Sequence, residues 1–515
     1  MYFVLIIAFA LLLTDGLPLP GWDVVDMLLR PLGRPFDRNL LTVGLLASIV
    51  PALGFTAWWL GRRACKARDG TPFGEDEMES RYSFAGWVLN CALAALISGL
   101  LLFTGWLDIV RSDWGLGRWP LLAELVILAP FLAAMIAAWI CLYPIELEIR
   151  TAVGAVFDEQ RGAAPRPWRL PTYLIYKIRH QILTVLIPMA GVLLCKYAVQ
   201  QWRDDIVTAL NIVWAPDALL GLMAATVLVA APVMLRYLWA TRPLPPGPLR
   251  DRLEALCRRV GLRYREILVW DSQNLVVNAA VMGLFSPVRY ILLSDGMLFT
   301  MTERQIEAVF GHEAGHVRRH HLLFFGIFAL LSMLIVGGLL ELLVRWTPLR
   351  HQEGLLQLVA LAALTGIWGL AFGFISRKFE RQADLYGVRC VTEPLAECER
   401  QCLLHTQAEP PRPMDERSRP ANNPGVPNAH AAVCATAVRL FGRTLVEVAH
   451  LNGIPLEAES WRHGSIQSRC DLLVRFAHDP AALIRFESGV ERIKAVLLGG
   501  TLIGSAIAAW LYWPF

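Results

Sequence analysis

Charge is scarce in this sequence. Asp, Glu, Lys and Arg make up 18% of the 515 residues, whereas 55% are hydrophobic, and the mean hydropathy is +0.46. Such a composition lies well beyond that of a soluble globular domain. An excess of one sign is also absent, since the formal net charge is +4 and gives no reason to expect a nucleic-acid partner. The composition therefore indicates a membrane protein.

Paired cysteines and internal repeats are missing too. The ten cysteines are scattered along the chain, and Cys141 lies inside an apolar run. This usage fits a reducing compartment. Cys398 and Cys402 are four residues apart on an expected helix, but no Cys or His pair stands at zinc-finger spacing beside them, so we interpret them as buried thiols.

Long apolar runs are abundant by contrast. Eight are long enough to span a bilayer: 40–60, 84–107, 121–143, 182–199, 219–235, 322–344, 355–375 and 496–513. Tyr2–Leu13 is shorter and lacks a basic flank, so it is either a ninth span or an uncleaved anchor. Tryptophans cluster at the ends of these runs, as interfacial aromatic residues do. We predict a mainly α-helical, polytopic membrane protein with about eight or nine spans.

One motif inside this membrane chain carries chemistry. His312, Glu313 and His316 form an H-E-x-x-H sequence. On a helix, two histidines four residues apart lie on one face, so both imidazoles can reach a single zinc ion. The glutamate beside the first histidine can then take a proton from the attacking water. Thr302 and Gln305 form a capping box that predicts a helix start at about Glu303.

A zinc hydrolase needs a third protein ligand. His320 continues the four-residue spacing, but three histidines along a straight helix extend over roughly 12 Å and cannot converge on one ion. Glu380 is the better candidate, with Asp384 one turn further on to accept the free N–H of a ligand histidine. Taken alone, an E-x-x-x-D pair is more typical of a solvated helix face.

At this point the chain resembles a known family, the integral-membrane gluzincins, which hold the type I CaaX prenyl protease and the heat-shock membrane protease HtpX. Residues 277–283 and 289–295 resemble the family's edge strand and hairpin, and 461–469 resembles its H-P-S-x-x-x-R segment with Gly464 in place of proline. The resemblance covers about 245–321 and 376–475. It implies a zincin-like catalytic region with a β-hairpin and one zinc ion.

The resemblance also implies roles for further residues. His463 is expected to donate to the developing oxyanion, although a lone exposed histidine often has no role. Asn278 and Ala279 lie in a run that can be an edge strand and hold an extended peptide, or Asn278 is a turn residue. Arg469 either braces the carboxylates or is a surface arginine.

The spacing of the ligands agrees with the predicted topology. Two predicted spans separate His316 from Glu380, and a helical hairpin returns to the face that it left, so both ligands lie on one side. Lys and Arg are more numerous in the loops on that side, which places the site in the cytoplasm. Those loops are 61–82 and 144–181.

We divide the chain into five segments. They are an N-terminal transmembrane region (1–240), a first catalytic part (241–321), a transmembrane hairpin (322–376), a second catalytic part (377–492) and a C-terminal transmembrane helix (493–515). A proline-rich insert at 409–428 is a lid or a spacer.

The zinc helix is expected to continue unbroken into the span at Leu322. In that case the residues between the motif and the span form a basic collar among the lipid headgroups. These residues are Arg318, Arg319, His320 and His321.

The predicted function is a zinc metalloendopeptidase that hydrolyses membrane-associated, misfolded or lipidated polypeptides, with the polypeptide and the bilayer as its partners. Two alternatives stay open. One is a receptor-peptidase that cleaves a cytoplasmic regulator, which the short opposite loops disfavour. The other is a transporter or scaffold with a relic motif, which would carry more ionisable residues within its spans than Lys196 and Glu124.

Overall fold

The computed structural model describes residues 38–65, 72–119, 121–161, 169–272, 276–347, 353–392 and 432–512. The predicted span Tyr2–Leu13, the insert at 409–428 and the pair Cys398 and Cys402 lie outside these residues. The chain divides into two compact units, Met1–Thr241 with His351–Gln357, and Arg242–Arg350 with Leu358–Phe515. We describe each unit by itself.

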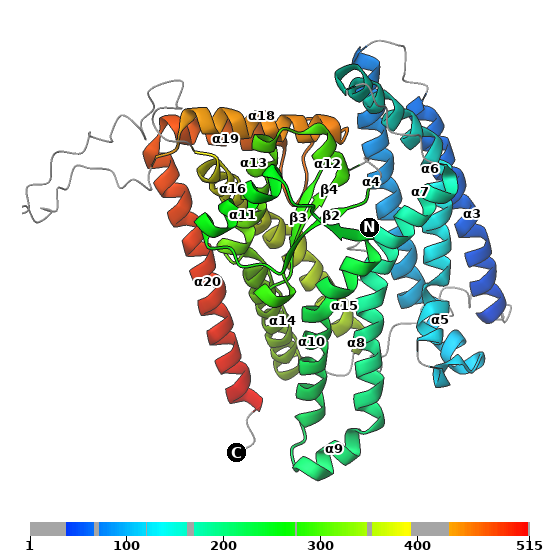
Figure 1. Ribbon diagram of the computed structural model, residues 1–515. Helices are drawn as coiled ribbons and strands as arrows, with labels where there is room; N and C mark the ends of the chain where they lie inside the picture. Colours follow the sequence, from blue (N-terminus) through cyan, green and yellow to red (C-terminus); the bar gives the residue numbers. More distant parts are fainter. Residues whose placement is uncertain are drawn as a thin grey trace, which may run out of the picture. The chain divides into compact units, whose positions relative to one another are not determined.

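The first unit is a set of long apolar helices (Figure 1). They are α3 (Arg38–Cys65), α4 (Pro72–Phe103), α6 (Leu122–Arg161), α7 (Leu170–Lys177), η4 (Ile178–Leu183), α8 (Thr184–Gln201) and α10 (Ala215–Leu238). Short connecting helices are α5 (Trp106–Asp108), η2 (Ile109–Asp113), η3 (Leu116–Arg118) and α9 (Arg203–Leu210). The buried carboxylate of Glu146 pairs with Lys177 over 3.1 Å and accepts hydrogen bonds from Tyr82 and Tyr173. This pairing lets a carboxylate stay among apolar helices.

Six helices of the described chain are long and apolar enough to cross a membrane. They are Thr42–Arg63, Leu122–Glu148, Leu170–Gln201, Ala215–Leu238, His321–Trp346 and Pro480–Trp510. The predicted spans at 84–107 and 355–375 are not among them. The first falls on α4, in which Phe84–Ile97 is a shorter apolar helix. The second falls on α15 (Glu353–Ile367), η7 (Trp368–Phe372) and the start of α16 (Gly373–Cys390). The expectation of a mainly α-helical membrane protein with a small sheet is confirmed, with the number of spans approximate.

The second unit contains a four-stranded sheet in the order β1-β2-β4-β3. Its strands are β1 (Thr241–Pro243), β2 (Glu266–Trp270), β3 (Ala279–Met282) and β4 (Tyr290–Ser294). Every residue of β4 is buried, as expected for a central strand. β3 pairs antiparallel with β4 and lies at an edge, so the predicted hairpin and edge strand are present. The short helices around the sheet are α11 (Pro248–Val260), η5 (Ser286–Val288) and α12 (Asp295–Thr300).

Helix α13 (Glu303–Arg318) carries the H-E-x-x-H motif and begins at the predicted capping box. The expectation that it continues unbroken into the membrane span is wrong. It ends at Arg318, His320 has a φ of 57°, and α14 (His321–Trp346) begins at the next residue. A left-handed residue other than glycine costs about 1–2 kcal/mol. The contacts that His321 gains at this break, described below, offset that strain.

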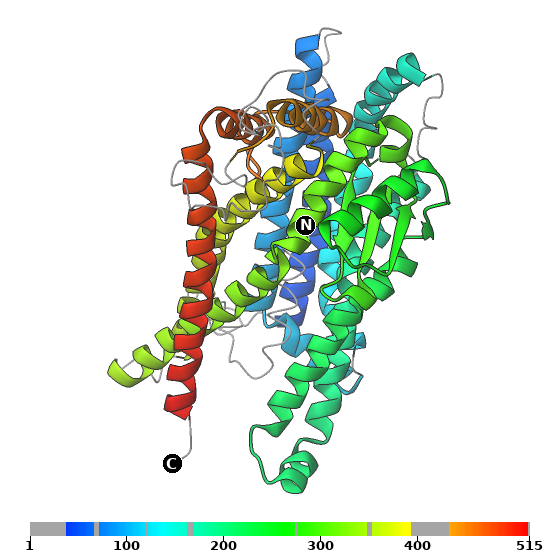
Figure 2. The same cartoon turned by 60° about the vertical axis from the view of Figure 1, so that its left-hand side comes forward.

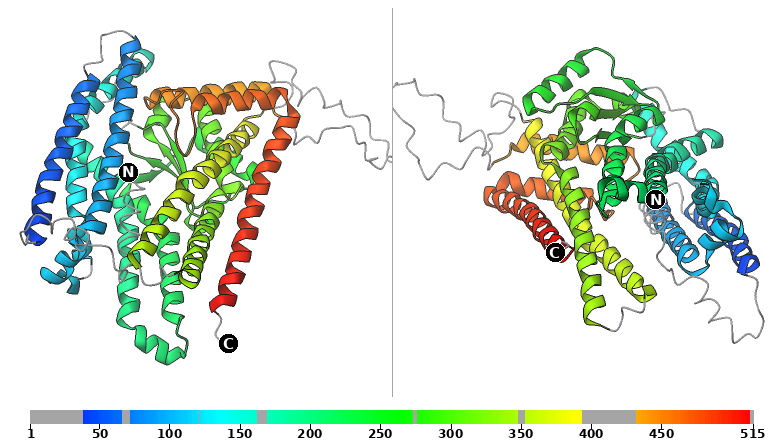
Figure 3. Two further views of the ribbon diagram at one scale, coloured as in Figure 1. Left: turned by 180° about the vertical axis from the view of Figure 1, so that it is seen from behind. Right: turned by 90° about the horizontal axis from the view of Figure 1, so that it is seen from below.

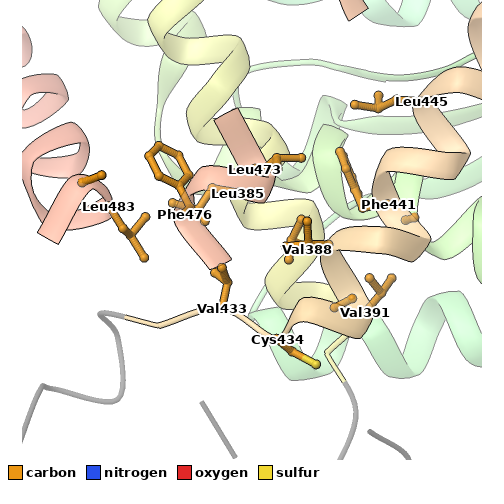
Figure 4. Packing of buried hydrophobic residues seen from close by; sticks show 14 residues of the cluster. Leu385, Val388, Val391, Val433, Cys434, Phe441, Leu445, Leu473, Phe476 and Leu483 are labelled. Atoms are coloured by element: carbon orange, nitrogen blue, oxygen red, sulfur yellow. The ribbon is translucent and has the colours of Figure 1, made fainter. Parts of the chain in front are cut away.

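Three further helices complete the second unit: α18 (Ala435–Leu451), α19 (Ile466–His478) and α20 (Pro480–Tyr512). α20 runs beside α14 and α16, and α18 and α19 lie crosswise to it (Figures 2 and 3). Figure 4 shows the apolar core where α16, α18 and α19 meet, with Phe441 and Phe476 almost fully buried. Burial of an aromatic side chain of this size contributes about 1.5–3 kcal/mol. This core fixes α16 and α19, which carry Glu380 and Arg469.

Candidate metal centre

His312, His316 and Glu380 lie together in the second unit and form a candidate metal centre. The two Nε2 atoms are 3.2 Å apart, and oxygens of Glu380 lie 3.6 Å from each. Ligand atoms placed tetrahedrally about 2.1 Å from one ion are separated by about 3.4 Å, so the spacing of these donors fits a zinc ion. Two imidazoles and a carboxylate are also a common donor set for catalytic zinc.

A close helix–helix approach brings Glu380 to the histidines. α13 places His312 and His316 one turn apart, and α16 crosses it at Gly387. A Cβ at Gly387 would lie 3.1 Å from the backbone nitrogen of His312 and would clash with Phe441. Glycine is required here because only a residue without a side chain leaves room for the helix carrying the histidines.

An ionic pair supports His312. The Nδ1–H of His312 donates to Oδ1 of Asp384 over 2.9 Å. Arg469 donates two hydrogen bonds to the same carboxylate, at 2.8 and 2.5 Å. Burial alone would raise the pKa of Asp384, but the charge and hydrogen bonds of Arg469 outweigh it and lower the pKa. The side chains of Asp384 and Arg469 are both buried. Asp384 therefore does not lie on a solvated helix face, and Arg469 is not a surface arginine.

A second set of contacts, which sequence reasoning missed, supports His316. We call the residues that support each candidate ligand histidine its arm: Asp384 and Arg469 for His312, and His321 and Gln382 for His316. Nδ1 of His316 lies 3.0 Å from Nδ1 of His321, and Nε2 of His321 lies 2.9 Å from Oε1 of Gln382. His321 is fully buried, so its assignment to a basic collar among lipid headgroups is wrong. Helical periodicity did not predict this contact, because His321 reaches His316 only where the helix breaks at His320.

Glu313 follows His312 on α13, and both residues line one cavity, which is described below. Burial raises the pKa of its carboxyl to about 7, aided by the charge of Glu380 and opposed by that of His312. A carboxyl with a pKa near neutrality is suited to taking up and releasing a proton in turn.

His463 lies beside the third candidate ligand. Its Nδ1 is 2.9 Å from Oε2 of Glu380, and its side chain is 46% exposed. Burial alone would raise the pKa of Glu380, but the hydrogen bond from His463 and the charges of His312 and His316 lower it below its usual range. Gly464 has a φ of 72°, which proline cannot adopt. The loop that carries His463 therefore differs locally from an H-P-S segment.

A cavity of about 810 Å³ opens over these residues. β3 forms part of its wall, and the start of α14 contributes Leu322 and Leu323. Oδ1 of Asn278 accepts from the N–H of its neighbour Ala279. Asn452 pairs with both backbone groups of Val277 and so occupies the strand edge just before β3, a contact that nothing in the sequence signalled.

The second unit matches known proteins. Residues 243–430 match the model of peptidase family M48. A protease HtpX homolog of Bacteroides fragilis is 28% identical over 158 residues, which cover 28% of this chain and 48% of that protein. A CAAX prenyl protease 1 homolog of Oryza sativa subsp. japonica is 26% identical over 194 residues, which cover 34% and 43%.

The crystal structure of S. mikatae Ste24p aligns with a TM-score of 0.48 and 16% identity over 86% of this chain and 100% of that chain. The chain spans about half the length of the curated relatives named above. The resemblance to the HtpX and CaaX protease family, drawn from four motifs, is confirmed.

Proposed function

Residues 243–430 carry a peptidase family M48 domain, and from this premise we propose that the chain is a zinc-dependent integral-membrane endopeptidase. Its substrates are membrane-associated, misfolded or lipidated polypeptides, and its site faces the cytoplasm. One observation carries the proposal: His312, His316 and Glu380 have the mutual spacing of zinc ligands, with Glu313 beside them.

The residues of the chain divide the chemistry among them. A zinc ion held by the three ligands supplies a Lewis acid for the scissile carbonyl and for the attacking water. Glu313 takes a proton from that water and passes it to the leaving amine. The position of Glu313, directly after His312 on α13 and in the wall of the cavity, supports this assignment.

His463 and β3 handle the peptide. We assign Nε2 of His463, the ring nitrogen that does not contact Glu380, to donation toward the developing oxyanion. Because β3 is an edge strand in the cavity wall, it can pair with an extended peptide through main-chain hydrogen bonds, with Asn278 and Ala279 at the start of the strand. Arg469 acts through Asp384 as a positioning residue.

The location of the cavity favours substrates at the bilayer. Leu322, Leu323 and Phe325 line it, and they belong to the first turns of the candidate span His321–Trp346. A polypeptide that lies on the membrane or emerges from it can therefore reach the site. The surplus of Lys and Arg in loops on the site's side supports the cytoplasmic orientation.

The test is zinc content together with cleavage of casein and a model membrane protein, for purified wild type and Glu313→Gln in mild detergent. We expect one zinc in both proteins and cleavage by the wild type alone. Glu303→Gln, a change of the same chemistry at an exposed position of the same helix, is the matched control and should cleave normally. A wild type that takes up no zinc after reconstitution would leave the scaffold or transporter alternative.

A further inference from the structure

We propose that His321 and Gln382 form a positioning arm that holds His316 in the tautomer and orientation needed to bind the metal. The arm joins α14 and α16 to α13, so three helices take part. The inference rests on the proposed zinc site and adds two residues to it. His321 contacts Nδ1 of His316 and not Nε2, the atom proposed to bind the metal.

The donor and acceptor of each hydrogen bond follow from Gln382. Its side-chain oxygen Oε1 faces Nε2 of His321 over 2.9 Å, and an amide oxygen can only accept a hydrogen bond.

The two imidazoles are then set in turn. Nε2 of His321 must carry a hydrogen to donate to Gln382, which leaves Nδ1 of the neutral ring as an acceptor. Nδ1 of His316 must therefore carry the hydrogen between the two rings, and the lone pair of its Nε2 is left for the metal. The amide of Gln382 on α16 thus determines the tautomer of a ligand on α13.

Packing holds the ring of His321 in place. It stacks on Phe379 with centroids 4.4 Å apart and planes 7° from parallel. His321 is fully buried and Gln382 is 2% exposed. Buried polar groups persist when they are hydrogen-bonded, and both ring nitrogens of His321 have partners. A residue in this setting cannot turn away to find water instead.

The helix break supplies an independent observation. His320 adopts a left-handed conformation, and α14 starts anew at His321. In an unbroken helix, residues five apart differ by about 140° in direction around the axis, so His321 would point away from His316. The strained residue is what turns His321 back toward the ligand.

The test measures zinc affinity by chelator competition and the visible spectrum of the Co²⁺-substituted protein, for the full-length chain in detergent. We expect His321→Ala to weaken zinc binding about 10- to 100-fold and to alter the Co²⁺ bands. His321→Asn, whose amide oxygen can still accept from Nδ1–H of His316, should recover part of the loss. Gln382→Met, which keeps the side-chain volume, should also weaken binding. His320→Asn, which keeps the left-handed conformation, is the matched control.

Zinc affinity and Co²⁺ spectra that are unchanged in His321→Ala and Gln382→Met would overturn the arm while leaving the proposed zinc site intact. The same holds if the Asn and Ala variants are equally weak, since that pattern indicates lost packing. A wild type that binds neither metal would overturn the proposed function and the arm together.

Discussion

The two candidate ligand histidines are held in different ways. His312 is held by an ion pair: its Nδ1–H donates a hydrogen bond to Asp384, and Arg469 neutralises the charge of that carboxylate. His316 is held by a neutral chain, in which His321 lies between His316 and the side-chain oxygen of Gln382.

This difference has an electrostatic reason. Burial of an ionised group is costly unless a partner compensates it. The arm of His312 buries two full charges and relies on their pairing. The arm of His316 contains only neutral groups, the imidazole of His321 and the side-chain amide of Gln382. We therefore expect the ionic arm to matter more for stability, and the neutral arm to matter mainly for metal binding.

Arg469→Met should have the largest effect, because it leaves Asp384 charged and buried without a partner. We expect the free energy of unfolding to fall by about 3–5 kcal/mol, measured by thermal or denaturant unfolding of the apo protein in detergent. The double variant Arg469→Met with Asp384→Asn should recover part of this loss. Equal losses in Arg469→Met and Gln382→Met would break the distinction between the two arms.

Gly464→Pro should separate metal binding from turnover. Proline cannot adopt the φ of 72° at this position, so the loop must move His463 away from Glu380. We expect kcat to fall about 100-fold, as for loss of one oxyanion donor, while zinc content stays unchanged. Gly464→Asn, which tolerates a left-handed conformation, should retain most of the activity. Loss of zinc from Gly464→Pro would show that the loop carrying His463 is needed for metal binding and not for turnover alone.

Gly387→Ala should weaken both arms together. The added methyl group would press on Phe441 and on the backbone of His312, and so force α13 and α16 apart. We expect the free energy of unfolding to fall by about 1–3 kcal/mol and the zinc affinity to fall as well. Gly442→Ala on α18 is the control, because its Cβ would meet only Cys470 Sγ at 3.9 Å. Normal zinc affinity in Gly387→Ala would show that the ligands tolerate a wider helix spacing.

His320→Gly should have the smallest effect. Glycine removes the left-handed strain but costs more backbone entropy on folding, so the net gain in stability is about 1 kcal/mol or less. Zinc affinity should not change, because His321 keeps its place. The melting temperature and chelator competition test both points. A loss of zinc affinity in this variant would mean that the side chain of His320 itself supports the site.

Much of the candidate site could be predicted from local spacing. Residues four apart on a helix share a face, which is why His312 and His316 could be paired from the sequence. Glu380 and Asp384 follow the same rule, and Arg469 came from the resemblance alone. The capping box at Thr302 also depends on neighbours only, and the structure contains it.

The residues that were missed depend on contacts distant in sequence. His321 reaches His316 through a strained residue, and no propensity predicts a left-handed histidine. Gln382 lies between two carboxylates that had clearer roles, and Asn452 meets Val277 from 175 residues away. Such contacts depend on how α13, α14, α16 and α18 pack, which periodicity does not reveal.

Composition and short-range spacing act locally, and they are enough to indicate the membrane class, the metal-ligand residues to expect and the helix that begins at Glu303. The end of that helix, the close approach of α13 and α16 at Gly387 and the groups that hold each imidazole depend on how the helices pack. Those outcomes arise from side chains that meet across separate helices. The balance of strain, burial and hydrogen bonding among them exists only once the chain has packed.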